Sequence, residues 1–102
     1  MDYLRRNGYP DARRQLAGDG LQSSDIDGVP GISIEVKDRA DSAWPTWRRQ
    51  ALTAASPLDS VVVVRRTRGN PDVGAWIAHV AVDYRREWRV TTFGDIFPEV
   101  QP

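Results

Sequence analysis

The chain has 102 residues, of which 40% are hydrophobic and 27% charged, and its formal net charge is zero. This length and composition indicate one globular domain, residues 1–102, with a single modest core. The absence of cysteine excludes disulfides and thiolate metal sites, and a single histidine, His79, argues against a zinc site. Any bound metal is therefore expected to be a hard cation held by oxygen atoms, Mg²⁺ or Mn²⁺.

No run of residues approaches the roughly 18 apolar residues that a membrane helix needs, so we expect a cytoplasmic protein with no membrane partner. The basic residues occur in arginine clusters, whereas Glu35 and five aspartates lie between Asp19 and Asp41. An acidic metal pocket surrounded by arginines that bind nucleic acid explains this pattern. An arginine-rich proteome with solvated charges explains it equally well.

In chain order, the sequence predicts a helix, three strands, a helix, two strands, a short third strand and a helical turn (α-β-β-β-α-β-β-(β)-α). The expected ranges are 2–7 for the first helix, 12–16, 25–27 and 32–37 for strands, 43–55 for the second helix, and 61–64, 75–82 and 88–91 for strands. Residues 17–20 and 28–31 are expected to form turns. This order predicts an α/β (α+β) fold with a mixed sheet flanked by helices.

Local patterns support these elements. In residues 32–37 apolar and polar side chains alternate, and residues 61–64 are four valines, as in a central strand buried on both faces. Ser42 is the expected N-cap of the second helix, whose apolar stripe contains Trp44, Trp47 and Ala51. Thr92 with Asp95 three residues later resembles a capping box at the last helical turn.

The candidate site is the segment from Asp25 to Lys37. Glu35 and Lys37 lie on the same face of one expected strand, about 7 Å apart. A short reversal at 28–31 can bring Asp25 beside Glu35, which gives the two carboxylates that Mg²⁺ takes from a protein. Asp27 has the same strand parity as Asp25 and is the alternative ligand. The alternative explanation of these polar side chains is a sheet with one solvated polar face and no metal site.

The lysine in this segment is informative because it is the only lysine among 14 basic residues. If lysine and arginine were interchangeable in this chain, the lone lysine would occupy this position with odds of roughly one in fourteen. The position therefore indicates a need for an ammonium group, which can approach a water molecule and a phosphate together. The expected chemistry is metal-assisted phosphodiester hydrolysis.

The segment Asp25-Ile26-Asp27-Gly28-Val29-Pro30-Gly31-Ile32-Ser33-Ile34-Glu35-Val36-Lys37 resembles the D-I-x-G-x-P-G-x-x-x-E-x-K motif of small phage-encoded PD-(D/E)xK nucleases, described as Holliday-junction resolvase-like. The resemblance extends over residues 3–82. It implies a restriction-endonuclease-like fold, branched DNA as substrate, a homodimer, and a phage or prophage origin in a bacterial host.

By this resemblance Asp25 and Glu35 are metal ligands, Lys37 is the catalytic lysine, and Gln50 on the following helix is directed at the site. Gln50 can equally be an exposed helical residue. The arginines expected to contact DNA are Arg13, Arg14, Arg65, Arg66 and Arg68, with solvated surface charge as the alternative for each. His79 is expected to be structural.

One departure from the family concerns an acid. Related nucleases carry a further glutamate on the first helix, and here Asp2, at a position that does not match, is the only acid nearby. We therefore expect this form to be weakly active or inactive unless an upstream extension supplies the acid. The alternatives are an inactive DNA-binding or assembly protein with the same fold, and a RecB-like or restriction-type nuclease on linear DNA. Five aromatic residues exceed what so small a core needs, and we expect some of them at the dimer interface: Trp44, Trp76, Trp88, Phe93 and Phe97.

Overall fold

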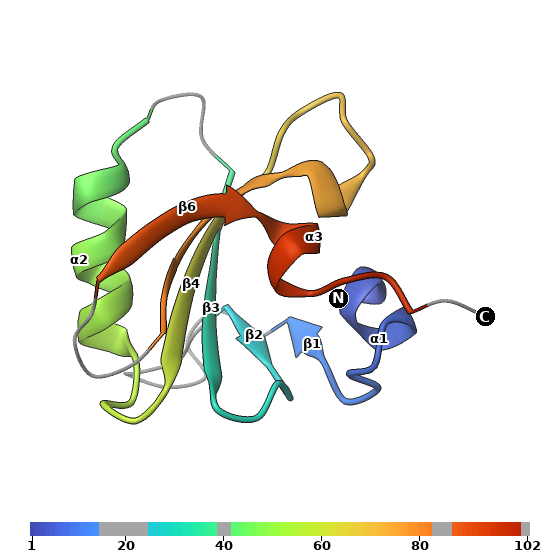
Figure 1. The fold of residues 1–102 in the computed structure, drawn as a ribbon, viewed down its shortest axis with the longest axis horizontal. Coiled ribbons are helices and arrows are strands. Elements are labelled where there is room, and N and C mark those ends of the chain that lie inside the picture. Colours follow the sequence, from blue (N-terminus) through green and yellow to red (C-terminus); the bar gives the residue numbers. More distant parts are fainter. Residues whose placement is uncertain (15–24, 39–41, 83–86, 101–102) are drawn as a thin grey trace.

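The structure, a computed structural model, describes residues 1–14, 25–38, 42–82 and 87–100. They form a six-stranded mixed sheet in the order β1-β2-β3-β4-β5-β6, with helices on both faces (Figure 1). In chain order the elements are α1 (Asp2–Arg6), β1 (Arg13–Arg14), β2 (Ile26–Asp27), β3 (Ile32–Lys37), α2 (Trp44–Ala54), β4 (Ser60–Arg65), the 3₁₀ turn η1 (Val73–Ala75), β5 (Ile77–Ala81), β6 (Trp88–Thr92) and α3 (Phe93–Ile96). The α+β class and the order of elements agree with the prediction, whereas the expected turn at 17–20 lies outside the described residues.

The strands β3 and β4 run parallel, and the other neighbouring strands of the described sheet pair antiparallel. A parallel pair needs a crossover connection, which α2 supplies. The side chains of β4 belong alternately to two hydrophobic clusters, and the four valines are fully buried, as the sequence predicted. Val62 and Val64 pack in the cluster that includes residues of α1 and α3, whereas Val61 and Val63 pack against α2.

The polar face of β3 is therefore the face beneath α2. Glu35 is the register partner of Val63, and Val63 packs with Trp47 and Ala51 of α2. Lys37 also contacts this helix through Gln50. The polar side chains of β3 thus lie beneath a helix. The alternative explanation of their alternation, a sheet with one open solvated face, does not describe this strand.

The helix α2 does not begin as predicted. Its N-cap is Ala43, without a side-chain cap, and the hydroxyl of Ser42 instead accepts a hydrogen bond from Arg65 at 3.4 Å. Pro45 occupies the first turn and has no N–H group, so one of the donors that a serine cap satisfies is missing there. The capping prediction holds at α3, where the hydroxyl of Thr92 accepts from the backbone N–H of Asp95 at 3.2 Å.

Of the five aromatic residues, some of which are expected at a dimer interface, three are core residues. Phe93 and Phe97 are 0% and 1% exposed, and Trp76 is 8% exposed, all within the cluster under α1 and α3. Phe93 stacks obliquely on Tyr3 and Phe97, which ties α3 to α1. The small core uses these rings because short helices contribute few other large side chains. Within the described ranges, no helix is long and apolar enough to cross a membrane.

The reversal between β2 and β3 requires glycine at both ends. Gly28 and Gly31 have φ values of +84° and +74°, in the left-handed region that other residues rarely adopt. At Gly28 a Cβ atom would also lie 2.0 Å from the backbone oxygen of Asp11. This turn fixes the antiparallel register of β2 on β3, in which Ile26 lies opposite Ile34.

Candidate metal centre

The site begins with the register of β2 and β3. Because Ile26 pairs with Ile34, the preceding residue Asp25 lies opposite the following residue Glu35. The backbone N–H of Asp25 donates to the carbonyl of Ile34 at 2.9 Å, and its carboxylate accepts from the backbone N–H of Val36 at 2.7 Å. Asp25 is thus held at the end of the strand pair by one backbone and one side-chain bond.

The two carboxyl groups are in contact. Burial raises the pKa of Glu35 to about 7, the negative charge of Asp25 and a side-chain hydrogen bond with Asp25 add to the rise, and the ammonium of Lys37 opposes it. Burial and the neighbouring negative charge of Asp25 both disfavour the charged form of Glu35. The electrostatics of the pair therefore favour a bound cation.

The next polar side chain along β3 is Lys37, on the same face as Glu35. Its ammonium group donates a long hydrogen bond, 3.4 Å, to the side-chain oxygen of Gln50 on α2. Gln50 therefore lies over the polar face of β3 as the resemblance implied, and it can orient the lysine. The structure brings together four of the predicted site residues, Asp25, Glu35, Lys37 and Gln50.

Asp27, the alternative metal ligand, is engaged elsewhere. It is the register partner of Arg13 on β1, and its carboxylate lies 3.6 Å from the guanidinium of that arginine. The side chain of Arg13 is 75% exposed and that of Asp27 is 49% exposed, so this ion pair is a weak surface contact. The two aspartates share a face, but only Asp25 has Glu35 as its neighbour.

The donor set fits a magnesium-type ion with few protein ligands. Mg²⁺ keeps several waters and takes one or two carboxylates, and Asp25 with Glu35 offers two. Over the ranges that the structure describes, no group of three or more acidic, histidine or cysteine side chains could hold a metal. Asp2, the nearest acid on α1, forms an ion pair with Arg5. A third ligand group from these residues is therefore absent.

Arginines that are neighbours in the sequence do not lie on the same face of the sheet. Consecutive strand residues point to opposite faces, so Arg13 and Arg65 lie on the face of Asp25 and Glu35, whereas Arg14 and Arg66 lie on the other. Arg66 and Arg68 both contact the carboxylate of Asp38, at 3.7 Å and 3.2 Å. Because of this alternation, Arg13 and Arg14 do not share one face of the sheet, and the DNA contacts expected of these arginines stay predictions.

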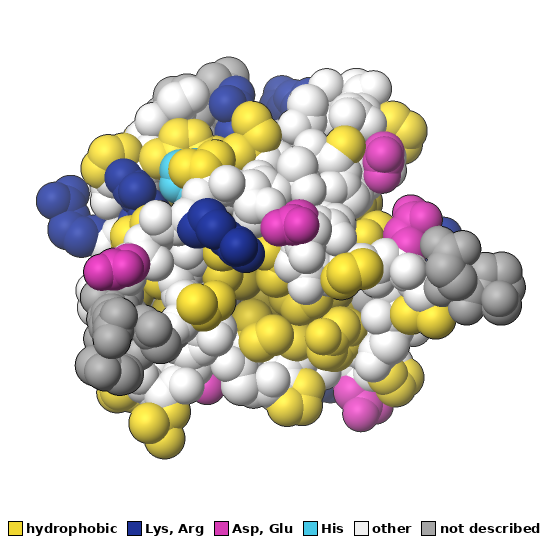
Figure 2. Space-filling model, viewed as in Figure 1, with side chains coloured by type: hydrophobic (Ala, Val, Ile, Leu, Met, Phe, Trp, Pro, Cys, Tyr) yellow, Lys and Arg dark blue, Asp and Glu magenta, His cyan; other side chains and the backbone are white. Residues whose placement is uncertain are grey.

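The face drawn in Figure 2 shows the same scatter. Basic and acidic side chains are interspersed around a central group of hydrophobic side chains, and the described residues form no continuous basic patch on this face. Net charge zero is consistent with this distribution. On this face, phosphate contacts would therefore involve individual arginines rather than a broad positive surface.

His79 is structural, as the sequence predicted. Its ring is 7% exposed and stacks on Trp44 of α2, with centroids 3.7 Å apart and planes at 5°. Burial, with a smaller effect from Arg48, lowers its pKa. His79 and Glu35 are both register partners of Val63, on opposite sides of β4, so a complete strand separates the histidine from the carboxylate pair.

Comparisons with models of known families, with curated proteins and with solved structures found no match to this chain. The residues and their geometry therefore carry the functional argument.

Proposed function

We propose that the protein is a Mg²⁺- or Mn²⁺-dependent DNA endonuclease of the PD-(D/E)xK type, with a restriction-endonuclease-like fold. The observation that supports this most strongly is the contact between the carboxyl groups of Asp25 and Glu35, with Lys37 on the same face of β3. The element order supports the finer fold assignment, since α2 follows the motif strand and returns the chain to a parallel neighbour. A phage or prophage origin and action in the bacterial cytoplasm belong to the same proposal.

In this mechanism Asp25 and Glu35 hold the cation from neighbouring strands. A bound divalent cation would polarise the scissile phosphate and lower the pKa of the attacking water. Asp25 is oriented for this role by the backbone N–H of Val36, which donates a hydrogen bond to one carboxylate oxygen and leaves the other for a cation. Loss of the Glu35 proton would accompany metal binding, because ligands must be deprotonated.

Lys37 supplies the second element of the chemistry. Its ammonium group can donate hydrogen bonds to the attacking water and to the phosphate, and its charge offsets the negative charge that develops in the transition state. Gln50 limits the conformations of the lysine through the 3.4 Å hydrogen bond from α2. Gln50 is therefore a positioning residue rather than a catalytic one.

The proposed substrate is branched or otherwise structured DNA, bound by a homodimer whose two-fold symmetry matches that of a four-way junction. Among the strand residues that the structure describes, Arg13 and Arg65 lie on the face of the carboxylate pair, and we assign them the phosphate contacts there. With Phe93, Phe97 and Trp76 in the core, only Trp44 and Trp88 among the five aromatic candidates remain for a dimer contact, and both are partly buried against the cluster between α2 and β4.

The second candidate is an inactive DNA-binding or assembly protein with the same fold. It is favoured by the absence of a third metal ligand in the described part of the chain and by the engagement of Asp2 with Arg5. Both candidates predict the same sheet and the same arginines. They differ in whether a divalent ion at Asp25 and Glu35 leads to cleavage.

The deciding experiment is a cleavage assay on four-way junction, flap, duplex and single-stranded DNA with Mg²⁺, Mn²⁺ or EDTA. We expect metal-dependent cleavage with a preference for the junction, lost in Asp25→Asn, Glu35→Gln and Lys37→Met and retained in Asp27→Asn. Cleavage that survives in all three site variants would contradict the active-site assignment. Mn²⁺ binding without cleavage of any substrate would establish the inactive alternative.

A further inference from the structure

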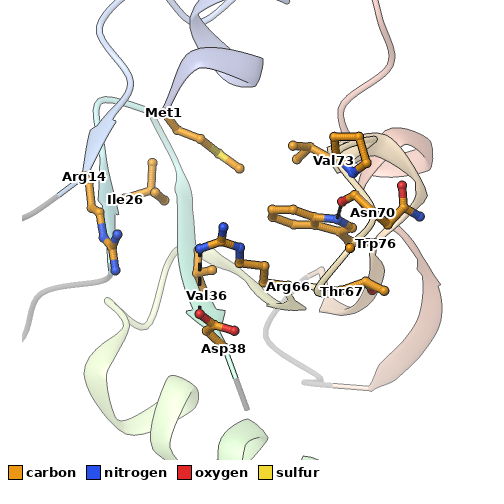
Figure 3. Close-up of a pocket in the computed structure, with 12 residues that line it drawn as sticks. Met1, Arg14, Ile26, Val36, Asp38, Arg66, Thr67, Asn70, Val73 and Trp76 are labelled. Carbon is orange, nitrogen blue, oxygen red and sulfur yellow. Dashed lines mark hydrogen bonds and ion pairs between the residues drawn. The ribbon is translucent and has the colours of Figure 1, made fainter. Parts of the chain in front are cut away.

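The sheet carries a second candidate binding site on the face opposite the carboxylate pair. A cavity of about 660 Å³ lies there, between the ends of β1 to β4, the N-terminal residue and the segment 66–76. Its lining includes Ile26 and Val36, whose register and alternation place them on the opposite face from Glu35, and Arg66, the residue that follows β4. Figure 3 shows these side chains converging on the cavity from the sheet, with Trp76 reaching in from the other wall.

The lining combines an apolar interior with arginine at the margin. Ile26, Val36, Val73 and Trp76 contribute the apolar part. Arg14 also lines the cavity, is exposed, and has no ion pair within the residues that the structure describes. Such a volume lies in the range of about 300–1,000 Å³ typical of small-molecule sites, in which apolar walls carry a few polar groups that fix orientation.

The charge of the cavity is positive despite the zero net charge of the chain. Asp38 is the acidic residue in the lining, and it is already shared by Arg66 and Arg68 at 3.7 Å and 3.2 Å. Among the lining residues, Arg14 and Arg66 carry two positive charges against the one carboxylate of Asp38. An anionic group is therefore the complementary ligand for the mouth, where Arg66 lies beside the apolar part (Figure 3).

The aromatic wall is held in place before any ligand binds. The indole N–H of Trp76 donates to the carbonyl of Asn70 at 2.9 Å, and Asn70 also accepts from the backbone N–H of Asp72 at 3.0 Å. The backbone N–H of Asn70 donates to the carbonyl of Thr67 at 3.2 Å. These bonds tie the segment that carries the cavity wall to the indole ring and lower the ordering cost of binding.

We propose that this cavity binds an aromatic base joined to a phosphate: the base contacts Trp76 and the aliphatic side chains, and Arg14 and Arg66 bind the phosphate. Indole and aliphatic surface suit the body of a base, and a guanidinium suits the oxygens of a phosphate. A free mononucleotide and the terminal nucleotide of a DNA strand share this chemistry. The site is independent of the carboxylate pair, since a full thickness of sheet separates them.

The test uses the full chain, in EDTA so that no metal recruits phosphate to Asp25 and Glu35. Binding of deoxyadenosine monophosphate, deoxyadenosine and ribose 5-phosphate is followed by NMR, through the indole N–H of Trp76 and the backbone N–H of Gly69 and Asn70. We expect saturable shifts at these groups with the monophosphate below about 10 mM, and binding at least about tenfold weaker when either base or phosphate is missing. A 5′-phosphorylated trinucleotide that binds more tightly, with the same Trp76 shift, assigns the site to a strand end. Weaker or equal binding assigns it to a free nucleotide.

Strand alternation supplies matched controls. Arg14→Ala and Arg66→Ala should each weaken monophosphate binding by about threefold or more, whereas Arg13→Ala and Arg65→Ala, one residue away on the other face, should leave it unchanged. Circular dichroism confirms that each variant is folded. Absence of saturable shifts at Trp76, shifts confined to Asp25 and Glu35, or equal losses in the four variants would each overturn the proposal.

Discussion

The carboxyl group of Glu35 shares a hydrogen bond with that of Asp25 across β2 and β3. Such a bond needs a proton between two groups that both prefer to be charged, and this proton is retained because burial, the charge of Asp25 and the hydrogen bond together raise the pKa of Glu35 to about 7. The same proximity that is unfavourable for two free carboxylates is favourable for two ligands of one cation. The pair therefore links pH to stability, and under the proposed function it links metal binding to both.

The pH dependence of stability follows from this shift. The pKa of Glu35 rises from 4.5 to about 7 on folding, so the native state binds more protons than the unfolded state between these values. The free energy of unfolding should therefore fall as the pH rises from about 4.5 to about 7. Urea denaturation at a series of pH values, without divalent metal, measures this contribution.

The matched variants are Glu35→Gln, which removes the titrating group, and Glu99→Gln, which changes an exposed glutamate. Glu35→Gln should reduce the decline and be more stable than the wild type above pH 7, whereas Glu99→Gln should follow the wild type. If Glu35→Gln shows the same pH profile as the wild type, the Glu35 pKa is not raised as described.

Metal binding should distinguish the two aspartates of the motif. Titration with Mn²⁺ by calorimetry at pH 8 should show one site, lost in Asp25→Asn and retained in Asp27→Asn, because only Asp25 contacts Glu35. The two variants are well matched, since each removes one negative charge from the same face of the sheet, at positions two residues apart. Equal loss in the two variants would instead indicate a site that depends on net charge or includes Asp27.

Lys37 should not be replaceable by arginine. Lys37→Arg keeps the charge but introduces a larger planar group, so cleavage should fall by about tenfold or more with Mn²⁺ affinity nearly unchanged. Gln50→Ala removes the 3.4 Å hydrogen bond from the ammonium and should cause a smaller loss. Full activity in Lys37→Arg would show that the position needs only a positive charge, and the lone lysine would then be coincidental.

The sequence was most predictive where one physical requirement dominates. The period of two in residues 32–37 and the valine run at 61–64 have no competing explanation, and β3 and β4 match them. The glycines at 28 and 31 similarly predicted the reversal that brings Asp25 to Glu35. Ser42 was misassigned because Pro45 removes the donor that a cap would satisfy.

The arginine surface and the second cavity could not be read in the same way. Neighbouring arginines in a strand look like one cluster in the sequence, but the pleat separates Arg13 from Arg14 and Arg65 from Arg66. The cavity depends on how the segment 66–76 folds back over the sheet, and its polar contact is a backbone carbonyl, that of Asn70, which any residue could supply. The indole N–H of Trp76 indicates that this residue needs a hydrogen-bond acceptor. A tryptophan buried in the core and one in a cavity wall both have this need, so the sequence does not distinguish them.

The turn between β2 and β3 gives a prediction about the site that requires no ligand. Gly28→Ala and Gly31→Ala both place a Cβ at positive φ, which costs about 1–2 kcal/mol. Gly28→Ala also brings that Cβ within 2.0 Å of the Asp11 oxygen, whereas Gly31→Ala meets nothing within 4 Å. Gly28→Ala should therefore be the more destabilising of the two in urea denaturation and should also weaken Mn²⁺ binding by displacing β2. Equal destabilisation would mean that the contact with Asp11 relaxes freely.

Salt dependence should show which arginines bind duplex DNA. Each phosphate that is neutralised contributes about 0.9 to the slope of log affinity against log salt. Arg13 and Arg65 lie on the face of the carboxylate pair, so the double variant Arg13→Ala/Arg65→Ala should reduce the slope by about 2 for a non-cleaved duplex in Ca²⁺ or EDTA. The control is Arg14→Ala/Arg66→Ala, which removes the same charge from the opposite face and, on a duplex without terminal phosphates, should leave the slope close to that of the wild type. Fluorescence anisotropy between low and physiological salt measures both slopes.

Two outcomes would contradict this assignment. Identical slopes in the two double variants would mean that DNA binding depends on net charge alone. DNA binding that does not depend on salt would make these arginines ordinary surface charges.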